Sequence, residues 1–450
     1  MDHRRRALWA LVILACMALL LAPAVWNGFP LLQYDTGGYL APWFDHLLAI
    51  NRPVPYGLLL VAGRWPDFWP VLIVQSALTV WVLALTLRAH RIGQRPLLLL
   101  GIVAALCVLT TLPWLTTILL TDIFAGLAVL AFYLLLLRDD ALKRSERIGL
   151  SLLVAYSAAT HSGTLAVLLA LAAAAALVRL IDSKQIPLTR LCRGALALTL
   201  GVVIMFASNL FVTGHLGWSR GGFALSFGRM LEDGIVKRYL DDHCPDPTLR
   251  LCTYKDLLPK DADDFLWGGG VFDKLGRFAG MDDEMRRIVL GALADYPGQQ
   301  LKSALTETAK QLTMVDTGAG VVNWVWNTYE TIETFVPAAV PAMKAARQQR
   351  TGISFTAVNL VQVPVAWFAM ALLPFIAGFA LRRTGLHDIG EFAAAMALAI
   401  LANAVVFGTL ATAHNRYGAR IVWIAGLVAL IALVRLVLNR SRGEAPGLPP

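Results

Sequence analysis

Long apolar runs dominate the pattern of hydrophobic and polar positions along this chain. Ten of these runs have the length of a helix and contain few charges. Because a bilayer tolerates no unpaired backbone groups, continuous runs of this kind predict membrane-spanning α-helices. The expected spans are residues 7–25, 69–87, 97–112, 122–137, 148–160, 164–180, 194–212, 355–381, 392–412 and 421–438. The sequence therefore predicts an all-α polytopic membrane protein with a bundle of about ten transmembrane helices.

Basic residues gather in alternate connections between these runs, as in RAHRIGQR, RDDALKRSER and RRTGLHD. Cytoplasmic loops of membrane proteins carry such an excess of Lys and Arg. Both termini are therefore expected in the cytoplasm, with a first outer loop at 26–55. A signal peptide is the alternative for the N-terminal run, but Pro23 to Asn27 is not a small-residue cleavage site and further spans follow.

Composition agrees with this pattern. Hydrophobic residues make up 57% of the 450 and charged residues 15%, with a mean hydropathy of +0.62. The net charge of +9 arises outside residues 213–354, where 23 Lys and Arg outnumber 12 Asp and Glu, against 16 and 18 inside. That excess lies mostly in the cytoplasmic connections. It therefore indicates orientation and contact with membrane lipids, and no nucleic-acid partner is expected.

The pattern divides the chain into three regions: an N-terminal transmembrane module at 1–212, a large extracytoplasmic insertion at 213–354, and C-terminal helices with a basic cytoplasmic tail at 355–450. Three cysteines lie in or beside apolar helices, where cysteine behaves as a small hydrophobe: Cys16, Cys107 and Cys192. The spacing of Cys244 and Cys252 permits a disulfide in the insertion. No CxxC or CxxH spacing indicates a zinc site.

Acidic residues are scarce outside the insertion, and eight of those 12 map to the cytoplasmic side. The four left at the outer face are Asp35, Asp45, Asp67 and Asp122. Asp35 and Asp122 each lie at the boundary of an apolar helix, where a carboxylate is partly desolvated and marks a candidate functional site. The alternative for Asp35 is an Asx turn or a helix cap, and for Asp122 it is the N-cap of its helix.

The neighbours of Asp35 include glycines that let a backbone approach a ligand and aromatic rings that could face a ring of that ligand: Tyr34, Gly37, Gly38 and Tyr39, with Arg52 and Tyr56 at the re-entry NRPVPYG. Basic groups at the outer helix ends could hold a phosphate: His161, His414, Arg416 and Arg420. Contact with lipid headgroups or snorkelling is the alternative for these groups. The chain has no Walker A, Rossmann, HExxH or GxSxG motif.

Taken together, these features resemble the GT-C superfamily of integral-membrane glycosyltransferases, including bacterial mannosyl- and arabinosyl-type enzymes. The resemblance rests on Asp35 in LLQYDTGGYL, on the proline-rich re-entry NRPVPYGLLL, on Asp122 in TDIFAGLAVLAFYLLLL and on His161 in ATHSGTLAVLL. A large outer insertion after the seventh helix also agrees with the family. The first loop departs from it in having a single acid rather than an acidic pair, and no metal ligand set can be assigned.

The resemblance implies sugar transfer from a polyprenyl-phosphate donor to a glycan, lipid or protein acceptor on the outer face of a bacterial inner membrane. Asp35 would be the general base or would orient the acceptor, and Asp122 would position the acceptor or support a possible divalent metal ion. His161, Arg416 or Arg420 would stabilise the leaving phosphate. The alternative function is a transporter or flippase, for which ionisable residues near mid-membrane and matched broken helices would be expected.

Overall fold

The computed structural model describes residues 3–441. Within that range every regular element is a helix, and strand-like pairing is limited to two isolated bridges. Seven helices are long and apolar enough to cross a membrane: α1 (His3–Asn27), α5 (Trp69–Ala89), α10 (Ser162–Ile181), α11 (Leu188–Thr213), α21 (Thr356–Leu381), α22 (His387–Leu410) and α23 (Asn415–Ser441). The all-α class and the membrane character expected from the sequence are confirmed.

Three further expected spans are helical but short: α6 (Pro96–Leu109), α8 (Asp122–Leu137) and α9 (Arg144–Thr160). They contain 14, 16 and 17 residues. At about 1.5 Å per residue these helices are shorter than the roughly 30 Å of a bilayer's hydrocarbon core. Seven helices of the described residues, rather than the expected ten, therefore have the length and composition of a span.

α8 is the central helix of the bundle. Its side chains from Asp122 to Leu136 are all buried, and it packs against α5, α9, α11 and α23. Apart from Asp122, the sequence of α8, DIFAGLAVLAFYLLLL, is apolar on every face of the helix. Such a pattern is typical of a helix that other helices enclose. Asp122 thus places a carboxylate at the first position of a buried apolar helix.

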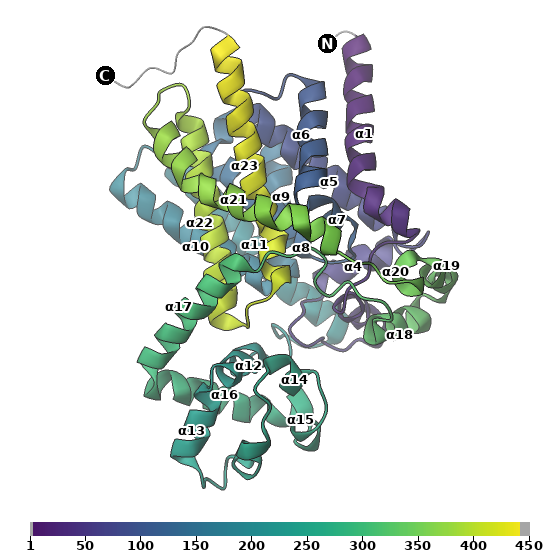
Figure 1. Ribbon diagram of the computed structural model, residues 1–450, viewed down its shortest axis with the longest axis vertical. Coiled ribbons are helices and arrows are strands. Elements are labelled where there is room, and N and C mark those ends of the chain that lie inside the picture. Colours follow the sequence, from purple (N-terminus) through teal and green to yellow (C-terminus); the bar gives the residue numbers. More distant parts are fainter. Residues whose placement is uncertain (1–2, 442–450) are drawn as a thin grey trace.

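The two ends of the bundle differ (Figure 1). Both termini lie at one end, and the first outer loop lies at the other. That loop contains α2 (Thr36–Leu40), α3 (Pro42–Asp45) and α4 (Pro55–Ala62), and α7 (Leu112–Thr117) lies near it. The 3₁₀ turn η1 (Asp139–Ala141) follows α8. Residues 1–2 and 442–450, which include most of the expected basic tail, lie outside the described residues.

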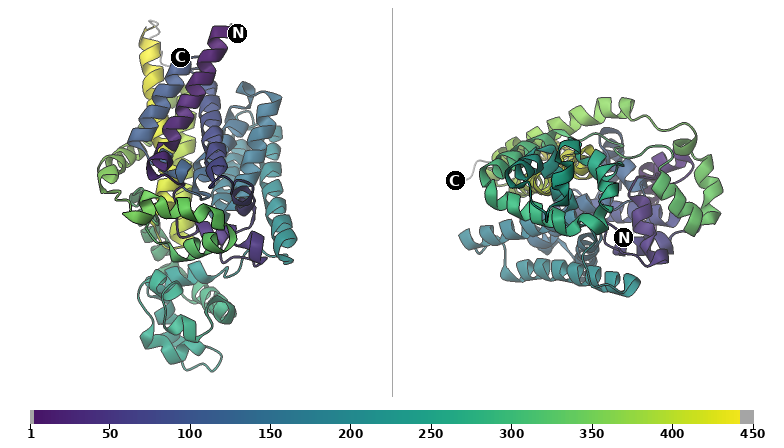
Figure 2. Two further views of the ribbon diagram at one scale, coloured as in Figure 1. Left: turned by 90° about the vertical axis from the view of Figure 1, so that its right-hand side faces the viewer. Right: turned by 90° about the horizontal axis from the view of Figure 1, so that it is seen from below.

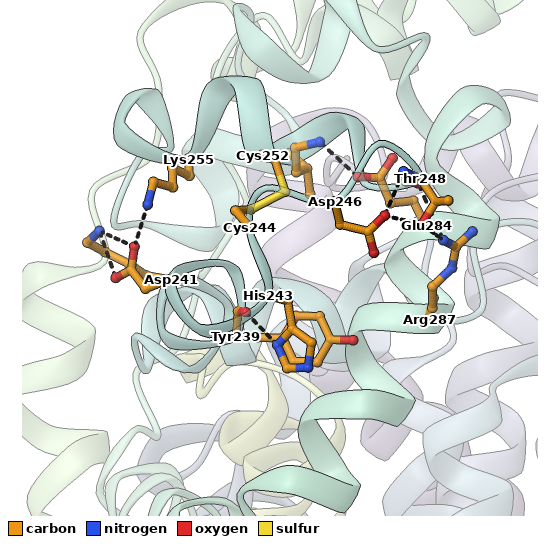
Figure 3. The surroundings of a disulfide bond; sticks show 12 residues. Tyr239, Asp241, His243, Cys244, Asp246, Thr248, Cys252, Lys255, Glu284 and Arg287 are labelled. Carbon is orange, nitrogen blue, oxygen red and sulfur yellow. Dashed lines mark hydrogen bonds and ion pairs between the residues drawn. A yellow bond between two sulfur atoms is a disulfide. The ribbon is translucent and has the colours of Figure 1, made fainter.

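Part of the insertion forms a separate small helical body beyond the bundle (Figures 1 and 2). It consists of α12 (Ala224–Glu232), α13 (Ile235–His243), η2 (Arg250–Leu257), α14 (Ala262–Leu266), α15 (Val271–Lys274) and α16 (Arg277–Asp295). These helices share an apolar core of their own that includes Phe227, Leu240, Phe272 and Met285. A disulfide joins Cys244 to Cys252 between α13 and η2, and Lys255 of η2 donates to Asp241 of α13 (3.1 Å) (Figure 3).

The rest of the insertion packs on the bundle. α17 (Pro297–Thr313) lies along α22. The short helices α18 (Trp326–Phe335), η3 (Pro337–Ala339), α19 (Val340–Ala345) and α20 (Arg347–Arg350) follow. Ile332 and Met343 from these helices belong to the core of the bundle. The insertion thus contributes both a separate body and a group of helices that surround the first outer loop.

Candidate functional site

Backbone pairing brings the two expected carboxylates to the same place. Leu31 N donates to Thr117 O (2.9 Å), and Leu119 N donates to Leu31 O (3.0 Å). These bonds tie the loop that carries Asp35 to the turn that leads into Asp122, the first residue of α8. The two carboxylates are therefore neighbours in space although separate helices follow them.

Arg416 connects the two carboxylates. This side chain belongs to the first turn of α23; its Nη1 pairs with Asp35, and its Nε donates to Asp122 Oδ2 (2.7 Å). Arg52 pairs with the other oxygen of Asp35. Arg420 lies one turn further along α23, with its Nη1 3.9 Å from Asp122 Oδ1. We call these five side chains the charge cluster.

His161 borders the charge cluster between α9 and α10. Its Nδ1 accepts from the backbone N–H groups of Gly163 (3.1 Å) and Thr164 (3.4 Å), as the N-cap of α10. Arg420 Nη1 lies 3.4 Å from both ring nitrogens of His161, and Arg420 Nη2 donates to Thr164 Oγ1 (3.0 Å). The guanidinium also lies over the Phe407 ring, 4.8 Å from its centroid. These contacts hold Arg420 in one position.

The charge cluster has more positive than negative groups. Three guanidinium groups face two carboxylates, which leaves one positive charge. The side chain of Arg420 is 1% exposed, that of Arg416 14% and that of Asp35 19%. The Nε atoms of Arg52 and Arg420 are buried without a hydrogen-bond partner. Because an unpaired buried donor is costly, the cluster favours the addition of an anionic acceptor.

The surroundings decide which groups are charged. Burial alone would raise the pKa of Asp35, but the charges of Arg52 and Arg416 and their hydrogen bonds outweigh it and hold that pKa well below its usual range. Burial lowers the pKa of His161 well below its ordinary value, and the charges of Arg420 and Arg416 lower it further. At neutral pH Asp35 is therefore ionised and His161 is neutral.

The aromatic residues expected to contact a substrate lie around the same loop. Tyr39 is buried, and its hydroxyl lies 3.3 Å from Thr121 Oγ1. Tyr56 donates to Gln75 Oε1 (3.0 Å), and its ring meets that of Tyr39 edge to face. Tyr34 has an exposed side chain. Tyr39 and Tyr56 thus support the loop from inside, and Tyr34 is the member of this set that is open to solvent.

The two glycines after Asp35 allow close approach. A Cβ at Gly38 would lie 3.0 Å from Cδ of Arg52, so the bare backbone leaves room for Arg52 to reach Asp35. A Cβ at Gly37 would lie 2.7 Å from Cα of Thr328, where α18 crosses the loop. Position 37 therefore requires glycine, because the backbone of Thr328 occupies the space of a side chain, whereas the neighbour at position 38 is the flexible side chain of Arg52.

The basic residues after α22 are arranged differently from the expectation. HNRYGAR was expected as a connection, but α23 already begins at Asn415, so Arg416 and Arg420 lie one turn apart on one helical face. His414 precedes the helix and forms hydrogen bonds with Thr412 (2.7 Å) and Gln311. The contacts described for His414 thus do not join it to the charge cluster.

Neither carboxylate makes a side-chain cap hydrogen bond to its helix. Asp35 occupies the N-cap position of α2 and Asp122 the first position of α8, but no side-chain cap hydrogen bond forms at either helix start. The carboxylates bond to arginines instead. The helix-cap alternative is therefore wrong for Asp122, since Thr121 is the N-cap of α8, whereas Asp35 holds the N-cap position of α2 without a side-chain cap bond.

Sequence reasoning missed the polar residues that support this site. Gln75 is fully buried in α5, and its Nε2 donates to the carbonyls of Thr116 (2.8 Å) and Ile118 (3.2 Å). A lone glutamine in the apolar run WPVLIVQSALTV was the available signal. Thr121 and Thr164 gave no such signal, because threonine is common near helix ends.

The possible divalent metal ion finds no ready ligand set. Among residues 3–441, no group of three or more His, Cys, Asp or Glu side chains could hold a metal ion. Asp35 and Asp122 already pair with guanidinium groups. The donor set of this site as it stands does not fit a cation.

The site combines two carboxylates, an excess of arginine and a neutral histidine, where the first outer loop meets the starts of α8 and α23. No protein-family model, curated protein or solved structure matches this chain.

Proposed function

We propose that this protein is a membrane glycosyltransferase that moves a sugar from a polyprenyl-phosphate donor to an acceptor. The observation that carries the proposal is the excess positive charge of the cluster formed by Arg52, Arg416 and Arg420 with Asp35 and Asp122. A phosphate would balance that charge and satisfy the two unpartnered Nε atoms. The resemblance to the GT-C superfamily supports the same chemistry.

The membrane-spanning helices beside the charge cluster favour a lipid as the carrier of this phosphate. The charge cluster lies where α8 and α23 begin, next to helices long enough to cross a bilayer. A polyprenyl chain could remain in the hydrocarbon layer while its phosphate reached Arg416 and Arg420. A nucleotide-sugar donor would need a nucleotide site, for which the sequence has no motif.

The reaction would be a displacement at the anomeric carbon of the sugar. An acceptor oxygen forms a bond to that carbon, the bond to the phosphate oxygen breaks, and its electron pair leaves with the polyprenyl phosphate. Arg416 and Arg420 would stabilise that charge. Asp35 would take the acceptor proton or orient the acceptor hydroxyl.

The resting ion pairs of Asp35 restrict its role as a base. A carboxylate held by Arg52 and Arg416 binds a proton poorly. If the donor phosphate draws Arg416 away, Asp35 loses one positive neighbour and becomes more basic. Donor binding would then precede proton abstraction, which favours an ordered reaction.

We place the reaction on the outer face of a bacterial inner membrane, with both termini in the cytoplasm. The insertion would then cover the site from outside and select a glycan, lipid or protein acceptor. The position of Asp35 and Asp122 at helix starts, rather than in the middle of a span, favours transfer over the transport alternative.

Purified protein in detergent would be tested with radiolabelled polyprenyl-phosphate sugars. Asp35→Asn is expected to lower kcat by about 10²- to 10⁴-fold, the range for losing a general base. Asp45→Asn is the matched control, because Asp45 is an exposed acid of the same loop that accepts only from the backbone of Leu47. Equal activity of Asp35→Asn and wild type would remove Asp35 from the mechanism.

The transporter alternative is tested in proteoliposomes with the same labelled donors. Movement of the intact donor across the bilayer, without any sugar transfer to acceptor, would support transport and contradict the glycosyltransferase. Transfer without net movement would support the enzyme.

A further inference from the structure

The end of the insertion meets the loop that carries Asp35. α18 packs on α2, and α20 contacts the end of α1. Figure 1 shows α18, α19 and α20 beside α4, at the end of the bundle opposite the termini. We call residues 326–350 the clamp helices. Their contacts with the loop involve specific polar groups as well as apolar packing.

Thr328 bonds to the loop on both sides of Asp35. Its side chain is fully buried, and its Oγ1 accepts from Gly37 N (2.9 Å). The same hydroxyl donates to Gln33 O (2.9 Å), with Tyr34 O at 3.2 Å. One hydroxyl therefore fixes the backbone before and after the carboxylate.

Gln348 fixes the start of the loop. This side chain is fully buried; its Oε1 accepts from Leu32 N (2.9 Å), and its Nε2 donates to Leu32 O (2.7 Å) and to Val322 O (2.9 Å). Its backbone N–H donates to Asn27 Oδ1 (2.8 Å) at the end of α1. Both backbone groups of Leu32 are thus paired by a single amide.

Close packing leaves the loop little freedom to move. A Cβ at Gly320, where φ is +76°, would lie 2.3 Å from Nε2 of Gln33. Gln33 Oε1 in turn accepts from Asp35 N (2.8 Å). On the opposite side, Thr36 Oγ1 donates to Leu119 O (3.0 Å). The loop is therefore held between the clamp helices and the turn before α8.

We infer that Thr328 and Gln348 are positioning residues, which hold the Asp35 loop so that its carboxylate meets Arg52 and Arg416. This inference rests on the proposed function for its kinetic consequence. Neither residue reaches the carboxylate itself, so neither is catalytic. The insertion would then set the geometry of the reaction, in addition to covering the site.

Thr328→Val tests the inference because valine has the shape of threonine without the hydroxyl. Loss of the hydroxyl leaves Gly37 N without its acceptor and removes the bond to Gln33 O, which keeps only the backbone N–H of Thr36 as donor. We expect kcat to fall about 10- to 100-fold, as a small misplacement of a reacting group does, with the donor KM changed less than about twofold. Thr328→Ser restores the hydroxyl and is expected to restore kcat.

Thr331→Val is the matched control. Thr331 lies one turn along α18 and is also buried; among residues 3–441 its hydroxyl donates to Asn327 O of its own helix alone. It is expected to keep the wild-type kcat. Gln348→Leu, which removes the bonds to Leu32, is expected to repeat the kinetic signature of Thr328→Val. Equal losses in Thr328→Val and Thr331→Val, or no loss in either clamp variant, would overturn the inference.

Hydrogen exchange separates this inference from the proposed function. The amide of Gly37 is expected to exchange about 5- to 10-fold faster in Thr328→Val than in wild type or Thr331→Val, because it loses its acceptor. That result would support the clamp even if the wild type transferred no sugar, which would contradict only the function. Unchanged exchange in Thr328→Val would contradict the clamp, whatever the activity.

Discussion

At the scale of single residues, His161 shows why the ionisation state of the site matters. Its Nδ1 accepts from two backbone N–H groups of α10, and Arg420 lies beside the ring. A proton on Nδ1 would remove the acceptor and add a positive charge next to Arg420 and Arg416. The fold therefore requires the neutral form of His161.

This requirement predicts a dependence of stability on pH. The folded pKa of His161 lies well below its unfolded value of about 6.5. The contribution of neutral His161 is therefore fully present above about pH 6.5 and is lost as the pH falls below it. We expect the Tm of the wild type to fall between about pH 6.5 and 4.5 more steeply than that of His161→Asn, because asparagine keeps an N-cap acceptor and does not titrate.

The melting curves would be followed by intrinsic fluorescence in detergent over that pH range. Parallel curves for the two proteins would contradict the assignment of a neutral His161. A steeper fall for His161→Asn would contradict it as well, because it would mean that protonation of His161 stabilises the fold.

Single residues were predictable where their chemistry was unusual for their place. Asp35 and Asp122 could be singled out because a carboxylate at an apolar helix boundary needs a reason. Arg416 was also singled out, as a phosphate-binding candidate, but its pairing with both carboxylates could not be predicted, because 381 positions separate it from Asp35 and only the fold brings them together. Thr328 and Gln348 gave no signal at all, since threonine and glutamine are ordinary residues in a polar insertion.

At the scale of elements, the alignment of α8 with α23 determines whether Asp122 meets Arg416. The helices touch at Gly126, where a Cβ would lie 2.6 Å from Nε1 of the Trp423 ring. Trp423 is itself almost fully buried. The indole therefore fills the space that a side chain at position 126 would need.

Gly126→Ala is expected to destabilise the fold by about 1–3 kcal/mol, as overpacking of a close-packed core does. It should also weaken sugar transfer, because moving α23 displaces Arg416. Gly101→Ala on α6 is the matched control, since nothing lies within 4 Å of its added Cβ. The better helix propensity of alanine should leave that variant unchanged or more stable by up to about 1 kcal/mol.

Thermal unfolding of both variants in the same detergent measures this difference. Gly126→Ala is expected to lower the stability, and Gly101→Ala to leave it unchanged or raise it. A general effect of adding a methyl group to a helix would instead change the stability of both variants in the same direction. Gly126→Ala as stable as wild type would show that Trp423 can move aside at little cost.

Elements were predictable to the extent that hydrophobicity defines them. The apolar runs located α5, α8 and α21 nearly to the residue. The start of α23 was missed because its first residues, NRYGAR, are polar. A prediction from apolar runs alone does not detect a polar helical turn. The clamp helices were missed because they are short and lie within a polar insertion, although Ile332 and Met343 of these helices pack into the core of the bundle.

At the scale of the whole molecule, the two ends of the bundle are expected to face different compartments. The termini lie at one end, while α4 and the body formed by α12–α16 lie toward the other (Figures 1 and 2). The sequence assigns the first end to the cytoplasm from its basic connections. Both assignments can be tested with one set of cysteine variants.

A membrane-impermeant maleimide should label Gly298→Cys in intact cells with a permeable outer envelope, and Ser183→Cys only after lysis. Gly298 is the second residue of α17, at the end of that helix next to α16, and Ser183 lies between α10 and α11. Both positions are exposed. The variants would be made after Cys16, Cys107 and Cys192 are replaced by alanine. Labelling of Ser183→Cys before lysis would reverse the proposed orientation.

The ion pair between Asp35 and Arg416 also has a consequence for biogenesis. Their separation of 381 residues means that Asp35 leaves the ribosome roughly 20 to 75 s before Arg416, at about 5–20 residues per second. Thr328 and Gln348 are also made late. During insertion the carboxylate must remain hydrated without its partner, and the site is completed only when the last helix arrives. A chain that stops short of α23 would thus reach the membrane without a competent site, so any activity would report a fully synthesised protein.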